Sequence, residues 1–270
     1  MPTVEKAGVK IWQKRDRSQT LLSWLGWLAG TAVVLYCAQI IAANTNWSFV
    51  ADAPEQASNM ISRGVPPNWA YLNTLWQALW DTLNIATLGT LLGVVIALPT
   101  AFLAARNTTP HPIVRYLALL VIVGSRSVNA LIWALLLVVV LGPGVLAGIL
   151  AIGLRSIGFT GKLFYEAIEE IDPQPVEAIA ATGASAAQIL SYGFWPQVMP
   201  SIFGVSFYRW DINIRESTVV GLVGAGGIGI QLQASINILR WSQVSSILLV
   251  VFLAVFVSEW ISATVRRLLI

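Results

Sequence analysis

The chain has 270 residues, of which 56% are hydrophobic and only 11% are charged, with a formal net charge of +3. Soluble domains carry about 25% charged residues, so this composition excludes an ordinary soluble domain and predicts an all-α protein that crosses a bilayer several times. The small positive charge calls for no nucleic-acid partner.

Five apolar runs are long enough, or nearly so, to cross a membrane. They are Leu21–Ala43, Thr82–Ala105, Tyr116–Leu141, Val145–Phe159 and Val244–Val265. Basic residues near the N-terminus (among them Lys14, Arg15 and Arg17), around Arg106 and Arg115, and at Arg266 and Arg267 favour the cytoplasmic side. Both termini are then cytoplasmic, and parity requires a sixth crossing that begins near Pro200.

This pattern divides the chain into four parts. Residues 1–20 are expected to form a cytoplasmic tail, 21–43 the first transmembrane helix, 44–81 an extracytoplasmic connection and 82–265 the core transmembrane domain. The third span is unusual because it contains Arg126, followed by Asn129. These side chains either line a polar path or, in the case of Arg126, extend to the membrane surface.

The segment between the fourth and fifth spans, expected in the cytoplasm, predicts two short helices. Asp172-Pro173 is a typical helix start, and Ser185 with Gln188 has the spacing of a capping box. Gly183 between them permits a sharp backbone turn. The segment is acidic, whereas helices that lie on lipid headgroups are usually basic. Docking to a basic groove on a partner protein is therefore favoured over an interfacial helix pair.

The expected sixth crossing contains four ionisable residues, Arg209, Asp211, Arg215 and Glu216. Each charge at the centre of a membrane helix costs roughly 2.5–3.5 kcal/mol on insertion scales. They are tolerable only when they pair or when they face water or protein. Asp211 and Arg215, four residues apart, can form a salt bridge on one helical face. A structural ion pair and a translocation path both remain open.

A glycine-rich stretch, VGAGGIG at residues 223–229, follows this crossing. Its G-x-G-x-x-G spacing matches a dinucleotide-binding turn, but that turn needs a preceding strand and an acidic residue about twenty positions later. The next acid after Glu216 is Glu259, so the dinucleotide interpretation fails. We expect a helix break for packing or gating, formed by Gly224, Gly226, Gly227 and Gly229, with an ordinary extracellular turn as the alternative.

Glu177-Ala178, Gly183 and Pro196 follow the spacing of a known motif, with Ile179 at its third position. It resembles the EAA loop of type I ABC importer permeases. The stretches EAIEEIDPQPVEAIAATGAS and NIRESTVVGLVGAGGIG are similar to permease subunits of phosphonate and phosphite importers. This resemblance implies a multi-pass protein of the bacterial inner membrane, with coupling helices at about 166–195. Glu177, Ala178, Gly183 and Ala184 would then contact the ATPase.

The same resemblance implies a homodimer with two ATP-binding cassette subunits and an extracytoplasmic substrate-binding protein. ATP and Mg would be bound by the ATPase, and no cofactor by this chain. The chain has no G-x-x-x-x-G-K-[ST] motif, and its only histidine and cysteine are His111 and Cys37. We therefore expect no catalytic residue and no metal site. An ion-coupled secondary transporter or channel is the competing class; a membrane enzyme lacks a nucleophile–base pair.

Overall fold

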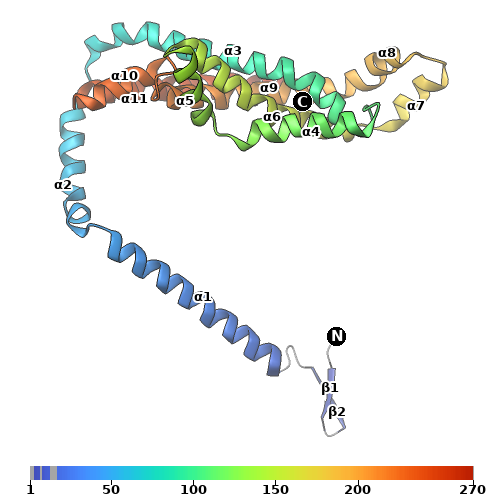
Figure 1. The fold of residues 1–270 in the computed structure, drawn as a ribbon, viewed down its shortest axis with the longest axis horizontal. Helices are drawn as coiled ribbons and strands as arrows, with labels where there is room; N and C mark the ends of the chain where they lie inside the picture. Colours follow the sequence, from blue (N-terminus) through green and yellow to red (C-terminus); the bar gives the residue numbers. More distant parts are fainter. Residues whose placement is uncertain (1–2, 7, 13–16, 270) are drawn as a thin grey trace. The chain divides into compact units, whose positions relative to one another are not determined.

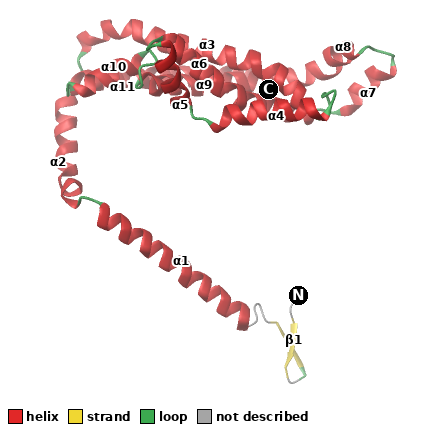
Figure 2. Cartoon of the chain, viewed as in Figure 1, coloured by secondary structure: helices red, strands yellow, loops and turns green. Residues whose placement is uncertain are grey.

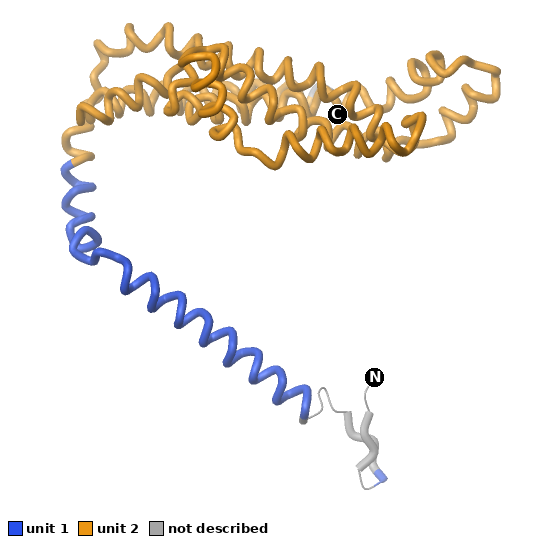
Figure 3. The backbone as a smooth tube through the Cα atoms, viewed as in Figure 1, with its two compact units in different colours: residues 1–59 blue, residues 60–270 orange. Residues whose placement is uncertain are grey.

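The computed structural model describes residues 3–6, 8–12 and 17–269. Lys14 and Arg15 of the basic N-terminal cluster lie outside the described residues. The chain divides into two units, Met1–Asn59 and Met60–Ile270 (Figure 3). Each is described by itself below.

The first unit contains a short β-hairpin, a long apolar helix and the beginning of a more polar one. Strands β1 (Thr3–Lys6) and β2 (Val9–Trp12) pair antiparallel with Thr3 opposite Trp12, an addition to the all-helical fold expected from composition. Helix α1 (Arg17–Asn44) contains the first apolar run, and none of its apolar window is buried. Helix α2 (Trp47–Gly64) begins in this unit, inside the stretch that the sequence predicted only as a connection.

The second unit is a bundle of helices (Figures 1 and 2). After the 3₁₀ turn η1 (Trp69–Tyr71), it comprises the long helices α3 (Leu72–Ala104), α6 (Val145–Glu169), α9 (Trp195–Gly221) and α11 (Trp241–Leu269). Between them lie α4 (Pro112–Ser127), α5 (Ala130–Leu141), α7 (Pro173–Ala181), α8 (Ala186–Gln188), the π-helical segment η2 (Ile189–Phe194) and α10 (Ile228–Asn237).

Helices α3, α6 and α9 form the centre of the bundle, and small residues let the backbones of α3 and α6 approach closely. A Cβ added to Gly93 of α3 would lie 2.5 Å from the Cβ of Ser156 in α6, and one added to Gly153 would lie 2.7 Å from Leu92 Cδ2. Such close approach is typical of membrane helices, whose association depends on packing rather than on burial from water. Larger side chains such as Phe164 and Ile168 are fully buried in the core.

The described residues include four helices long and apolar enough to cross a membrane, namely Ser18–Asn44, Trp69–Ala104, Val145–Glu169 and Trp241–Arg267. Helices α4 and α5, bent by 88° at Val128–Asn129, make a fifth span if they cross together. Helix α9 has 27 residues and begins at Trp195, close to the start expected for the sixth crossing, although its composition is too polar for the same test. The fold of long helices is as expected; the count of six spans and the side of each terminus remain predictions.

Candidate functional site

The charged residues of α9 form two separate clusters, and the first faces α6. The guanidinium of Arg209 donates from Nη2 to Glu216 Oε2 at 3.0 Å and from Nε to Ser156 Oγ at 3.1 Å. Its side chain is only 2% exposed, and its Cζ lies 5.0 Å from the ring centre of Phe159. Arg209 is therefore a buried cation whose hydrogen bonds go to Glu216 and Ser156, and its small exposed surface leaves little area for contact with a solute.

A second arginine, Arg155 of α6, reaches the other oxygen of the same carboxylate. Its Nε lies 3.5 Å from Glu216 Oε1, and its Nη1 donates to the backbone oxygen of Val128 at 3.4 Å. Sequence reasoning did not select Arg155. The signal was present, since Arg155 is the only charged residue in the expected span Val145–Phe159.

Neutral polar side chains hold the same three helices together beside these charges. The buried Asn213 of α9 donates from Nδ2 to Thr90 Oγ1 of α3 at 2.7 Å and to Ser156 Oγ of α6 at 3.0 Å. Ser156 Oγ thus accepts from both Asn213 and Arg209. Because buried polar groups need partners where water is excluded, this network fixes how α9 is rotated against α3 and α6.

The second cluster of α9 faces α11. Arg215 Nη2 lies 2.6 Å from Asp211 Oδ2, which confirms the salt bridge expected from their spacing. Ser258 of α11 donates to the other carboxylate oxygen, Oδ1, at 2.7 Å. The Asp211 side chain is 6% exposed and that of Arg215 is 44% exposed. An exposed guanidinium on a membrane helix faces water or protein rather than lipid tails.

The other two candidate residues, Arg126 and Asn129, flank the break between α4 and α5. Asn129 is exposed, and its Oδ1 accepts from the backbone N–H of Leu131 at 3.2 Å, which makes it the N-cap of α5. Arg126 is exposed, and its stem crosses α6 at Gly158, where an added Cβ would lie 2.6 Å from Arg126 Cγ. Gly158 follows Arg155 by three residues, so the two lie on the same side of α6. The stem of Arg126, which belongs to α4, therefore contacts the side of α6 that carries Arg155.

The glycine segment lies between α9 and α10 and packs against two other elements. Gly224, Gly226 and Gly227 all have positive φ, at +91°, +91° and +71°. A Cβ on Gly227 would lie 2.6 Å from Thr82 Oγ1, the same oxygen that accepts from the backbone N–H of Ile228 at 2.8 Å. On the other side, the N–H of Gly144 donates to the Gly224 oxygen at 3.0 Å. The fourth glycine, Gly229, lies in α10 directly against Gly221 at the end of α9.

Helices α7 and α8 extend beyond one end of the bundle (Figure 1). Asp172 caps α7 by accepting from Gln174 N at 3.0 Å, and Gln188 Oε1 accepts from Ser185 N at 2.8 Å. Gly183 turns the chain between them with φ +80°. Glu177 and Ala178 are exposed on α7, whereas Ala184 is half-buried. A concavity of about 430 Å³ opens between the helices, lined by Ile179, Thr182, Gly183, Ala184, Gln188 and Tyr192.

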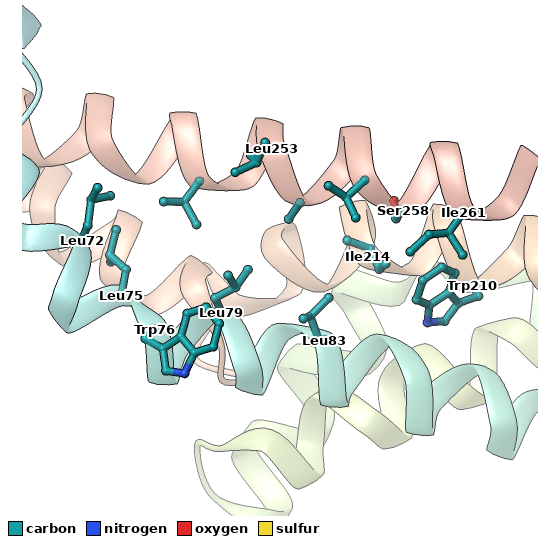
Figure 4. Close-up of a pocket in the computed structure, with 13 residues that line it drawn as sticks. Leu72, Leu75, Trp76, Leu79, Leu83, Trp210, Ile214, Leu253, Ser258 and Ile261 are labelled. Atoms are coloured by element: carbon teal, nitrogen blue, oxygen red, sulfur yellow. The ribbon is translucent and has the colours of Figure 1, made fainter. Parts of the chain in front are cut away.

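A larger cavity, of about 630 Å³, lies between α3, α9 and α11 (Figure 4). Its lining is almost entirely apolar, with Trp76 and Trp210 among leucines and isoleucines. Trp210 directs its Nε1 to Thr87 Oγ1 at 3.0 Å. This cavity suits hydrocarbon and not an anion. Within the part of the chain that the structure describes, no group of three His, Cys, Asp or Glu side chains could hold a metal ion.

Long apolar helices, paired charges on one polar helix and a helix pair beyond the bundle define a membrane-spanning transport component. The model of the binding-protein-dependent transport system inner membrane component family matches residues 89–269. The chain belongs to this family, and it is a permease subunit of an ABC transporter rather than an enzyme. The fold matches an inward-facing structure of the MetNI methionine ABC transporter, with a TM-score of 0.66, 20% identity and coverage of 75% of this chain and 99% of that one.

Two relatives are closer in sequence. The phosphite transport system permease protein PtxC of Stutzerimonas stutzeri is 42% identical over 210 residues, which cover 78% of this chain and 76% of that protein. The phosphate-import permease protein PhnE of Mycolicibacterium smegmatis is 40% identical over 219 residues, which cover 81% of this chain and 41% of that protein.

Proposed function

We propose that this permease moves a phosphorus oxyanion, a phosphite, phosphonate or related ion, across the bacterial inner membrane. Two observations support this substrate class. The relatives similar over about four-fifths of the chain carry phosphite and phosphate transport in their names. In addition, exposed guanidinium groups on helices α4 and α9 offset the cost of removing an anion from water.

The proposed assembly is a homodimer with two ATP-binding cassette subunits and an extracytoplasmic substrate-binding protein. The helix pair α7 and α8, which extends beyond the bundle (Figure 1), supports the ATPase contact in this proposal, because a concavity of about 430 Å³ opens between its helices. The acidic Glu177 on its outer helix complements a basic groove on the ATPase. ATP and Mg are then bound and used by the ATPase, and helices α7 and α8 of this chain move when the ATPase subunits close.

Polar contacts hold the helix pair α7–α8 rigidly where it joins the bundle. Gln197 of α9 accepts from the backbone N–H of Asp172 at 3.1 Å and donates to the oxygens of Asp172 and Gly193 at 3.2 and 2.8 Å. Glu169, at the end of α6, accepts from the backbone N–H of Arg106 at 2.8 Å. A displacement of α7 by the ATPase is therefore transmitted to α6 and α9, the helices that carry the buried charges.

The path itself is proposed to pass the exposed charges Arg126 and Arg215, with Asn129 at the adjacent helix break. Arg209 and Asp211 support this path by fixing α9 against α6 and α11, and the half-buried Glu216 pairs with Arg209 beside it. The glycines at 224, 226, 227 and 229 give a compact break that rocking of α9 can displace as a unit.

Reconstitution tests this function against the competing class, an ion-coupled transporter or channel. Proteoliposomes containing the permease, its co-purifying ATPase and the binding protein should accumulate phosphite or methylphosphonate only when ATP is supplied. Accumulation by the permease alone, driven by an ion gradient, would instead establish a secondary transporter.

A further inference from the structure

The cluster between α4, α6 and α9 has more positive than negative charge. Arg155 belongs to α6, Arg209 packs against Ser156 and Phe159 of α6, and the stem of Arg126 crosses α6 at Gly158. Among the described residues, Glu216 is the only carboxylate within salt-bridge distance of any of these arginines. Arg155 and Arg209 share a single carboxylate, which leaves an excess of one positive charge at Glu216, and Arg126 adds a third cation whose stem lies one helical turn along α6. Such an excess in a membrane protein calls for a counter-anion.

The two arginines that share Glu216 are held very differently. Arg209 is 2% exposed and makes contacts of 3.0 and 3.1 Å to Glu216 and Ser156. Arg155 is 30% exposed, approaches Glu216 only through Nε at 3.5 Å, and reaches the Val128 oxygen at 3.4 Å. Arg209 is therefore the fixed partner of Glu216, whereas Arg155 has both the weaker contacts and the accessible surface.

We propose that Arg155 and Arg126 form an oxyanion subsite within the membrane, and that Glu216 occupies the place of the anion until the solute arrives. The ligand class is a tetrahedral phosphorus oxyanion, whose oxygens match the paired donors of a guanidinium as a carboxylate does. The inference rests on the proposed function for its substrate and adds a residue, Arg155, and a competing group, Glu216.

The proposed movement of Arg155 from Glu216 to the anion also affects the break between α4 and α5. Arg155 Nη1 donates to the oxygen of Val128, which lies between α4 and α5 where the axis bends by 88°. When Arg155 turns from Glu216 and Val128 towards the anion, that backbone oxygen loses its side-chain partner. Binding of the anion thus releases a contact that holds the bend.

Opposite effects of two substitutions test the competition. In detergent, phosphite added to the purified importer should raise its melting temperature more than equimolar chloride, by an amount that grows with the logarithm of the phosphite concentration above its dissociation constant. Arg155→Gln should abolish this difference. Glu216→Gln should lower the half-saturating phosphite concentration by about fivefold, because an ion pair of about 1 kcal/mol no longer competes. Equal stabilisation of the wild-type protein and Arg155→Gln, or weaker binding in both variants, would overturn the subsite.

Charge rescue provides the second readout. Cys37 is the only cysteine of this chain, so Cys37→Ser gives a thiol-free permease as the background for Arg155→Cys, and the importer with Cys37→Ser alone shows any effect of the reagents on its partners. Uptake of phosphite should fall at least tenfold, recover on treatment with a cationic aminoethyl methanethiosulfonate, and stay low with the neutral methyl reagent. Arg240→Cys, at an exposed position between α10 and α11, is the matched control and should retain uptake.

The outcomes separate the two proposals. Restoration by the neutral reagent would show that Arg155 fills space, and the subsite would be rejected while the proposed function stands. A wild-type importer that accumulates neither phosphite nor methylphosphonate refutes the proposed substrate, and the melting-temperature comparison still decides whether Arg155 and Glu216 compete for an oxyanion.

Discussion

Replacing Gly183 should uncouple the permease from its ATPase without unfolding the bundle. Gly183 has φ +80° and donates its N–H to the Ala180 oxygen at 3.0 Å, so it ends α7 in the left-handed conformation. That conformation costs other residues about 1–2 kcal/mol, and more when the side chain is β-branched. A Cβ at this position would meet no atom within 4 Å, so the cost is confined to the backbone.

Gly183→Val should therefore reduce the population of the correctly turned helix pair by about 5–30-fold. ATP-driven uptake and ATPase retention on purification should fall together, while the melting temperature of the permease in detergent stays within experimental error. Gly183→Asn is the matched variant, because asparagine tolerates positive φ, and it should retain most activity. Full uptake in Gly183→Val, or equal losses in both variants, would refute the assignment of the turn as the element that matters.

Three further substitutions probe packing and charge in the bundle. Gly93→Ala places a methyl group 2.5 Å from the Cβ of Ser156 and should destabilise the bundle by about 1–3 kcal/mol. Gly124→Ala is the control, because an added Cβ there meets no atom within 4 Å, and it should be neutral. Equal melting temperatures of the two variants would contradict the close-packing argument. Arg215→Ala leaves the buried Asp211 carboxylate with only its hydrogen bond from Ser258, and the cost is about 1–3 kcal/mol because Arg215 is 44% exposed and water replaces part of the pairing. The double variant with Asp211→Ala should lose less than the sum, as a double-mutant cycle will measure. Thr82→Val removes the acceptor of the Ile228 N–H and should destabilise the protein by about 1–3 kcal/mol. Amide hydrogen exchange across residues 224–229 should become faster. Unchanged exchange would show that Thr82 does not hold this break.

The sequence alone was sufficient for features that depend on near neighbours. Apolar runs located the long helices because a bilayer demands about twenty apolar residues for each helix. Asp172, Gly183 and Ser185 located the two short helices, since caps and turns are read within four residues. The Asp211–Arg215 pair is of the same kind, because residues four apart share a helical face. The predicted beginning of α9 was only a few residues late despite its polar composition.

Only the tertiary structure decided which charges meet. Arg209 joins Glu216, seven residues away, because Ser156 and Phe159 of α6 fix its side chain from another helix. Arg155 reaches the same carboxylate across 61 positions of sequence, a pairing that no local spacing encodes. The 88° bend at Val128–Asn129 likewise divides what hydropathy presents as one continuous run. Composition and spacing determine which segments enter the membrane and where they turn, whereas packing between distant helices determines which side chains share one cluster.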